Sequence, residues 1–231
     1  MKFANLIWHE NGPYSLDFND VYYNSLDGLA ETEYVFILQN QLKKRFTSPL
    51  SKTFTIIETG FGTGLNFYCT ASHWLATSPK NTILHYISIE KFPLKTEDMR
   101  KISDLWPTFK MTTTELLLNY QQIKPHLNIF NLAEKRILLH LYVDDISAGL
   151  SQITQNADTW FLDGFAPAKN AEMWSDEVFK QIARLSNSGT TFSTFTSASL
   201  VRKGLDAVGF NVQKLSGFGK KREMLSGVFA E

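Results

Sequence analysis

Three glycines at alternate positions follow a short β-rich segment and precede a helical one. The segment 54–58 reads Phe-Thr-Ile-Ile-Glu, the glycines are Gly60, Gly62 and Gly64, and apolar residues recur at helical spacing from Leu65 onward. Glycine permits a tight turn and a close approach of backbone to ligand, and the start of a helix offers unpaired N–H groups. The dinucleotide fingerprint G-x-G-x-x-G does not fit, because Leu65 occupies the place of its third glycine. The sequence therefore predicts a strand, a turn and a helix with a ligand at the turn.

The same alternation of strand and helix continues along the chain. It predicts an α/β fold of the Rossmann-like type, with a mostly parallel sheet flanked by helices. Ligands then belong at the carboxyl ends of the strands. Gly189 and Gly209 are interpreted as C-caps of the helices that precede them. Further strands are expected at 83–89, 137–143, 159–162 and 190–195, and further helices at 96–105, 113–120, 175–185 and 198–208.

The two ends of the chain differ from this pattern. Residues 210–215 and 224–229 are predicted to form a C-terminal antiparallel hairpin, because a glycine-bearing loop joins them. Residues 29–45 are predicted to form one helix behind a turn-rich lead. We therefore expect an N-terminal extension, 1–50, packed on a single Rossmann-like domain, 51–231.

Charge is balanced in sum but not in position. The 231 residues carry 23 Lys and Arg against 23 Asp and Glu, which excludes a globally basic nucleic-acid coat. Residues 3–42 contain six acidic residues and no Lys or Arg, whereas Lys220, Lys221 and Arg222 form a basic cluster near the C-terminus. A polyanion would bind at this cluster first. The alternative interpretation is two solvated faces that partly cancel.

Several classes of protein are excluded by what the sequence lacks. Cys69 is the single cysteine, so no internal disulfide forms and a reducing compartment is expected. The five histidines are scattered without metal-ligand spacing, none makes a credible pair with Cys69, and no metal is predicted. No apolar run approaches the roughly 18 residues of a membrane span, and no secretory segment is recognisable. The expected location is cytoplasmic.

Acidic residues end the next two predicted strands as well. Glu90 follows the strand at 83–89, where a carboxylate can accept both ribose hydroxyl hydrogens. Asp144 and Asp145 follow the strand at 137–143, and either can accept from the exocyclic amine of an adenine. A capping role for Asp145 at the next helix is the alternative. These positions predict a nucleoside ligand.

Asp163 ends the strand at 159–162 and is the candidate for the reacting end of the site. Its side chain is expected to point into the same crevice as Glu58 and Glu90. A carboxylate there can hold an acceptor amine, orient its lone pair and take up a proton. Phe165 and Pro167 are candidates for a flat apolar wall, with simple packing as the alternative.

Several segments of the chain form a specific combination of motifs: 13–15, 18–22, 58–67, 88–94, 160–170, 194–196 and 217–225. The string Phe-Leu-Asp-Gly-Phe-Ala-Pro-Ala-Lys-Asn at 161–170 is the most specific of them. Together these segments resemble one family, the methyltransferase half of the tRNA 5-methylaminomethyl-2-thiouridine biosynthesis enzyme. The resemblance implies N-methylation of 5-aminomethyl-2-thiouridine at the tRNA wobble position with S-adenosylmethionine as cofactor. It also implies an FAD-dependent oxidoreductase as a domain of the same chain or as a separate partner.

The resemblance also implies roles for individual residues. Asp163 would face the acceptor amine, Glu90 would hold the ribose and Asp145 the adenine, although Asp144 stands where the family pattern has glycine. The methionine end of the cofactor would lie on Glu58, Gly60, Phe61, Gly62, Thr63 and Gly64. The tRNA would lie on Phe165, Pro167, Lys169, Lys220, Lys221 and Arg222.

Two other classes of function are weighed against this one. An aminopropyl transferase, or another small-amine N-methyltransferase of the same fold, has an amine acceptor beside an Asp but needs no basic C-terminal cluster. A non-catalytic RNA-binding module would keep the cluster and bind no S-adenosylmethionine.

Overall fold

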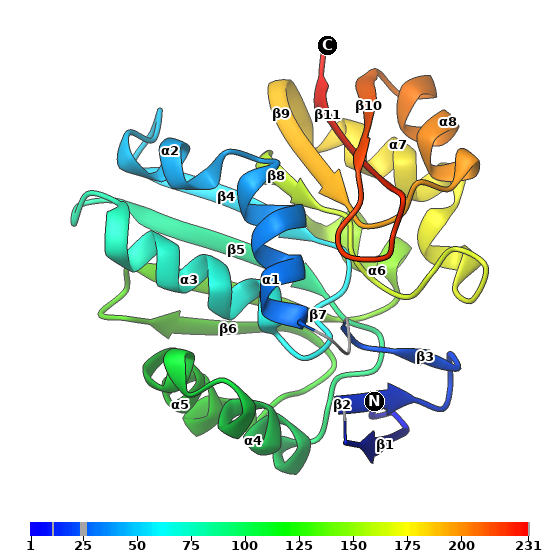
Figure 1. Ribbon diagram of the computed structural model, residues 1–231. Helices are drawn as coiled ribbons and strands as arrows, with labels where there is room; N and C mark the ends of the chain where they lie inside the picture. The colour runs from blue at the N-terminus through cyan, green and yellow to red at the C-terminus, as the bar shows by residue number, and fades with distance from the viewer. Residues whose placement is uncertain (11, 24–26, 231) are drawn as a thin grey trace.

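The computed structural model describes residues 1–10, 12–23 and 27–230, in which an eight-stranded sheet is the central element. Its strands are β4 (Thr53–Glu58), β5 (Ile83–Ile89), β6 (His126–Leu132), β7 (Ile137–Val143), β8 (Ala157–Phe161), β9 (Ser186–Thr194), β10 (Phe210–Ser216) and β11 (Glu223–Phe229). Their order is β10-β11-β9-β8-β4-β5-β7-β6 (Figure 1). The five strands from β9 to β7 are parallel, and β6, β10 and β11 are antiparallel to their neighbours. The predicted fold class and the C-terminal hairpin are confirmed.

Helices cover both faces of this sheet and enclose two hydrophobic cores. Ile56 of β4 packs in the first core and its neighbour Ile57 in the second, because successive side chains of a strand point to opposite faces. The first core lies under α1 (Gly28–Thr32), η1 (Glu33–Leu38), α2 (Leu42–Thr47), α3 (Leu65–Thr77), α4 (Thr96–Leu105), η2 (Pro107–Phe109) and α5 (Lys110–Tyr120). The second lies under α6 (Ile146–Gln152), η3 (Ala171–Trp174), α7 (Asp176–Arg184) and α8 (Ser199–Ala207). Among the described residues, none of these helices combines the length and apolar character that crossing a bilayer requires.

A small antiparallel sheet precedes the helices and was not foreseen from the sequence. It consists of β1 (Leu6–His9), β2 (Gly12–Ser15) and β3 (Asp20–Val21). The Ala4 N–H donates to the Pro93 carbonyl at 3.0 Å, and the Trp8 indole donates to Asp98 of α4 at 2.8 Å. These bonds attach the N-terminal segment to the region after β5. The division at residue 50 stays a prediction, and residues 28–47 pack on the same sheet face as α3.

The single helix predicted at 29–45 is wrong. The chain is α-helical at 28–32, π-helical at 33–38 and α-helical again at 42–47, with Gln41 in the left-handed region at φ 53°. Buried Asn40 lies at the break, where its amide donates to the Phe36 carbonyl at 3.0 Å and to Ser193 of β9 at 2.7 Å. This partner is 153 residues away in sequence, so a local pattern contains no sign of the break.

The C-cap interpretation is confirmed for one glycine and wrong for the other. Gly209, at φ 104°, follows α8, and its N–H donates to the Asp206 carbonyl at 3.2 Å. Gly189 lies inside β9 at φ 90°, because α7 already ends at Arg184. The register between β8 and β9 shifts beside it, as at a β-bulge. The other predicted strands and helices are confirmed within a few residues, and β6 was missed.

Candidate functional site

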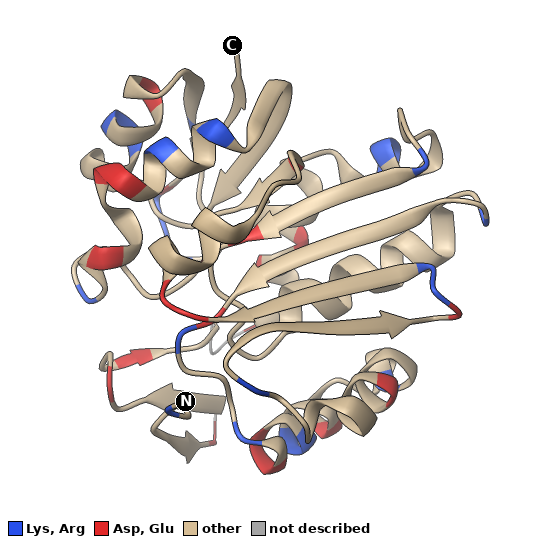
Figure 2. Cartoon of the chain, turned by 180° about the vertical axis from the view of Figure 1, so that it is seen from behind, with Lys and Arg blue, Asp and Glu red and all other residues tan. Residues whose placement is uncertain are grey.

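A cavity of about 440 Å³ lies at the carboxyl ends of the central strands. Glu58 is the last residue of β4, and Glu90, Asp144 and Asp163 follow β5, β7 and β8; these strands are neighbours in the order β8-β4-β5-β7. Figure 2 shows acidic segments where the arrowheads of these strands converge. Strand order reverses direction at β4, which is the place where open α/β sheets bind ligands. The size suits a small-molecule ligand.

The glycine loop forms one wall of this cavity. Gly60, Phe61, Gly62 and Thr63 line it. A Cβ on Gly60 would stand 3.3 Å from the carbonyl oxygen of Asp163 and 3.4 Å from Cα of Gly164, so the two loops pass each other closely. Gly62 and Gly64 have φ of 52° and 78°, a region that glycine adopts without strain.

Gly64 has a different position from the rest of the loop. It is the N-cap of α3, and its Cα faces the rings of Tyr68 and Phe61. It is not among the residues that line the cavity. Gly64 therefore shapes the start of α3 without lining the cavity.

Glu90 lies at the end of β5, on the next wall. One carboxylate oxygen accepts the Gly62 N–H at 2.8 Å and the other accepts the Phe92 N–H at 2.9 Å. Burial raises the pKa of Glu90, and these backbone donors oppose the shift. The side chain lines the cavity and holds the glycine loop in place.

Asp144 and Asp145 also line the cavity, with different partners. Asp145 accepts the Ser147 N–H at 3.1 Å as the N-cap of α6, and its second oxygen lies 3.0 Å from the Lys91 ammonium. The capping role that the sequence left open is thus present, whereas contact with an adenine stays a prediction. Asp144 faces His126, 3.1 Å away.

Asp163 reaches the cavity from the loop after β8. One oxygen accepts its neighbouring Gly164 N–H at 2.8 Å, and the other accepts the amide of Asn66 at 2.7 Å. Burial raises the pKa of Asp163 to about 6, against the lowering effect of these two donors. The carboxyl group therefore changes its charge closer to neutral pH than an exposed Asp.

Glu58 is fully buried and does not line the cavity. Its carboxyl oxygens accept the Asn66 amide at 3.0 Å and the Ser88 hydroxyl at 2.8 Å. Burial, followed by the nearby Asp163 carboxylate, raises the pKa of Glu58 to about 8. The direct contact of Glu58 with a cofactor stays a prediction. The Asn66 amide lies between Glu58 and Asp163.

Aromatic rings close the cavity on the side of the N-terminal segment. The Phe165 ring stacks on Phe18 with centroids 4.5 Å apart and meets Tyr22 edge-on at 5.3 Å. All three residues line the cavity, in agreement with the expected flat wall at Phe165, whereas Pro167 does not line it. Two neighbours from the N-terminal segment, which the sequence did not single out, thus take part in the site.

The predicted basic residues have unequal positions. Lys221, in the β10–β11 loop, lines the cavity, forms an ion pair with Glu31 of α1 at 2.8 Å and lies 4.3 Å from the ring centroid of Phe195. Lys220 and Arg222 are exposed in the same loop and do not line the cavity. Lys169 forms an ion pair with Asp20 at 3.1 Å, so part of its charge is already balanced by the acidic N-terminal segment.

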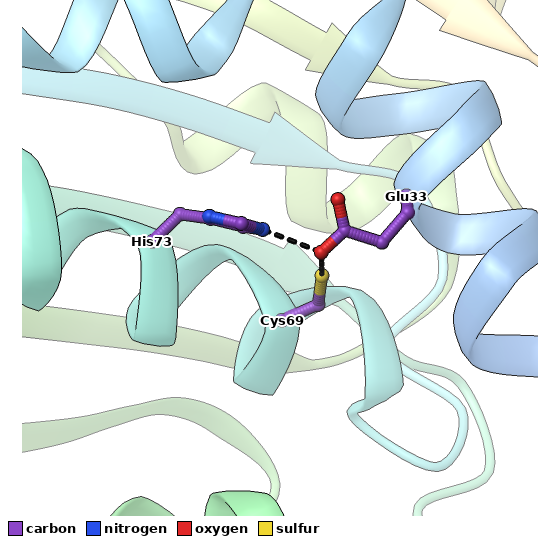
Figure 3. Close-up of side chains that lie close together, drawn as sticks. All are labelled: Glu33, Cys69 and His73. Atoms are coloured by element: carbon purple, nitrogen blue, oxygen red, sulfur yellow. Dashed lines mark hydrogen bonds and ion pairs between the residues drawn. The ribbon is translucent and has the colours of Figure 1, made fainter.

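Cys69 and His73 both contact Glu33, away from the cavity (Figure 3), and the expectation that they form no Cys–His pair stays a prediction. The two lie one turn apart on α3, and the thiol lies 3.3 Å from the carboxylate oxygen that also accepts from His73. The Lys43 ammonium lies 3.2 Å from the other oxygen of Glu33 and balances its charge. We interpret the cluster as the polar contact between η1 and α3, and the absence of a metal stays a prediction.

Sequence reasoning assigned no role to Asn66 or Thr32. Asn66 occupies the first turn of α3, and the Thr32 hydroxyl donates to its side-chain oxygen at 2.8 Å. The only signal in the sequence was the position of Asn66 two residues after the last glycine of the loop. Thr32 is 34 residues away and had none.

Comparisons with known proteins agree with this geometry. A protein-family model described as S-adenosyl-L-methionine-dependent methyltransferase matches residues 107–230. A crystal structure of MNMC2 from Aquifex aeolicus covers all of this chain, and the chain covers 72% of it, with a TM-score of 0.73 and 22% sequence identity. At that identity the likeness concerns the fold.

Two curated relatives carry the name tRNA 5-methylaminomethyl-2-thiouridine biosynthesis bifunctional protein MnmC. The one from Methylobacillus flagellatus is 48% identical over 226 residues, and the one from Ectopseudomonas mendocina is 46% identical over 228. Each match includes 98% of this chain and 35% of the relative. The chain thus spans about a third of the length of these relatives.

Proposed function

Because the chain belongs to the family of S-adenosyl-L-methionine-dependent methyltransferases, we propose that it methylates the amine of 5-aminomethyl-2-thiouridine at the wobble position of tRNA. The observation that carries the proposal is Asp163, whose carboxylate shares one cavity with the glycine loop and Glu90. The place proposed for the methyl donor is therefore adjacent to an acid that can hold the acceptor amine. The relatives that match 98% of the chain are named for this modification.

The residues of the cavity fit the cofactor. S-adenosyl-L-methionine supplies an activated methyl group on a positively charged sulfur. The backbone of Gly60 and Gly62 is open to a ligand, and Glu90 presents a carboxylate suited to a ribose diol. Asp145 beside Asp144 is suited to an adenine amine. We therefore assign Gly60, Phe61, Gly62 and Thr63 to the methionine end, with Gly64 as the cap of α3.

Asp163 orients the acceptor and receives its proton. A protonated ammonium has no lone pair, so the amine must be neutral when its nitrogen attacks the methyl carbon. When bound, S-adenosyl-L-methionine would supply that methyl carbon, and its sulfur would keep the electron pair of the broken carbon–sulfur bond as the bond to nitrogen forms. The nitrogen then gives up one proton, which the Asp163 carboxylate accepts. Phe165 provides an apolar surface for the base, and holding the reactants in line supplies most of the acceleration.

The proposal is tested by incubating the protein with methyl-labelled S-adenosyl-L-methionine and tRNA that carries 5-aminomethyl-2-thiouridine. Nucleoside analysis should find the label in 5-methylaminomethyl-2-thiouridine. A tRNA that carries an unmodified wobble uridine is the control and should stay unlabelled. A folded, cofactor-binding protein that labels neither tRNA would contradict the proposal.

The word bifunctional in the names of the relatives supports a companion activity. We propose an FAD-dependent oxidoreductase in this role, as a domain of the same polypeptide or as a separate protein. It would produce the aminomethyl group whose amine then contacts Asp163.

We predict that the activity is lost in acid as Asp163 becomes protonated. The pKa of this carboxyl group is raised to about 6, so the base is ionised above that pH and neutral below it. The kcat at saturating cofactor and tRNA should therefore fall as the pH drops through about 6. An exposed Asp would give the same fall near pH 4. A kcat that stays constant from pH 7 to pH 5 would argue against this role.

Replacing Lys220, Lys221 and Arg222 together with Ala should weaken tRNA binding. Each phosphate contact that is lost lowers the slope of log affinity against log salt by about one. Binding measured from 50 to 200 mM salt should show a lower affinity and a flatter slope. The matched control replaces Lys52, Lys80 and Lys135, which are exposed at the amino ends of the strands. Equal effects of the two triple variants would exclude a specific role of the cluster.

A further inference from the structure

Asn66 connects two carboxyl groups that differ in their access to the cavity. Its side-chain nitrogen donates to Glu58 at 3.0 Å and to Asp163 at 2.7 Å. Glu58 is fully buried, whereas Asp163 lines the cavity. Asn66 itself is 7% exposed. The amide is therefore the direct link between the acid proposed to receive the substrate proton and one that substrate does not reach.

The orientation of this amide is determined by its partners. The side-chain oxygen accepts the Thr32 hydroxyl at 2.8 Å, which leaves the nitrogen facing the two carboxyl groups. Turning the amide over would place its oxygen against the Asp163 carboxylate and lose the hydrogen bond to it. The hydrogen bond from Thr32 of α1 supports the orientation in which Asn66 donates to the acids.

The two carboxyl groups cannot both be ionised at little cost, because each has an oxygen within 3.0 Å of the same nitrogen. Such a pair loses its protons in two separate steps. The groups around the Glu58 carboxyl are neutral: Asn66 and Ser88 donate to it, and the Tyr86 phenol of β5 lies beside it. Asp163 has the Gly164 N–H and, further away, the Lys221 cation, which lowers its pKa. Glu58 is therefore the acid that keeps a proton, and Asp163 the one that releases it.

We propose that Asn66 is a positioning residue that holds the Asp163 carboxylate toward the acceptor amine, with Thr32 and a protonated Glu58 fixing the amide. The inference rests on the proposed function of Asp163. Charged groups on other elements also act on that carboxylate: Glu31 of α1 raises its pKa and Lys221 of the β10–β11 loop lowers it. Neither forms a hydrogen bond with it, so the geometry of Asp163 depends on Asn66 and Gly164.

The test follows the two carboxyl groups by ¹³C NMR in the full chain, with no acceptor present. The wild type should show two steps, near pH 6 and near pH 8. Glu58→Gln should remove the upper step and leave the lower one in place. Asn66→Leu, which has a similar shape and no hydrogen-bonding group, should raise the lower step by about one unit, because a donor to the ionised form is lost. Thr32→Val should shift it in the same direction by less, and Asn119→Leu on the exposed face of α5 is the control.

Kinetics give a second readout. Asn66→Leu should lower kcat about 10- to 100-fold, as expected when a catalytic group is misplaced, with cofactor affinity changed less. If Asn66→Leu does not fold, Thr32→Val carries the same test. An Asp163 step at the same pH in the wild type and in both variants would overturn the inference. The titration needs no tRNA, so a wild type without transfer to the proposed acceptor refutes the proposed function and leaves the network to be judged separately.

Discussion

Asp163→Asn is expected to lower kcat for methyl transfer by about 10²- to 10⁴-fold, the usual contribution of a general base. The variant keeps the size of the side chain and one oxygen, in place of the two that accept the Gly164 N–H and the Asn66 amide. It loses the charge that holds the amine and the site that takes its proton. Single-turnover transfer with tRNA at saturating cofactor measures this loss.

The affinity for S-adenosyl-L-methionine should change only a few-fold in this variant, because Asp163 is assigned to the acceptor. Calorimetry of cofactor binding separates the two effects. Asp176→Asn, on the exposed first turn of α7, is the control and should leave both quantities unchanged. A defect confined to cofactor affinity would reassign Asp163 to the donor side.

Glu90→Ala should weaken cofactor binding about 30- to 150-fold, since hydrogen bonds to a charged group contribute about 2–3 kcal/mol. Two losses both lower the cofactor affinity of this variant. The carboxylate proposed to bind the ribose is removed, and the N–H groups of Gly62 and Phe92 lose their acceptor. The glycine loop then loses the contact that holds it against β5. Titration calorimetry gives the change in dissociation constant.

A graded series makes this prediction specific. Glu90→Gln keeps one oxygen as an acceptor and should lose less affinity than Glu90→Ala. Glu97→Ala, on the exposed first turn of α4, is the control. Transfer at saturating cofactor should persist in Glu90→Gln. Equal affinity in the wild type and Glu90→Ala would show that the ribose binds elsewhere.

The parallel strands and the acids that end them were predictable because both follow from local patterns. Buried strands appear as short apolar runs, and the residue after each run falls at the same edge of a parallel sheet. Glu90 and Asp163 line the cavity as this reasoning requires. The strand β6 was missed because it is a half-exposed edge strand that contains polar Asn128 and Asn131.

The neighbours of each acid were not predictable, since they come from distant segments. Lys169 faces Asp20 across 149 positions, and Lys221 faces Glu31 across 190. The acidic N-terminal region therefore contacts two of the residues that the sequence analysis assigned to tRNA binding. Some of the opposite charges that cancel in the zero net charge of the chain therefore meet as ion pairs at the cavity.

The sequence by itself determined that this chain forms a Rossmann-like sheet with a glycine turn and acids at the ends of its strands. Hydrophobic periodicity and glycine conformation are local properties, so they can be recognised in the sequence alone. The tertiary structure decided which of those acids meets the cavity. Glu58 and Asp163 look alike in the sequence, yet Glu58 is enclosed by Asn66 and Ser88 while Asp163 opens to the ligand. Burial depends on what packs around a residue, and that is a property of the whole fold.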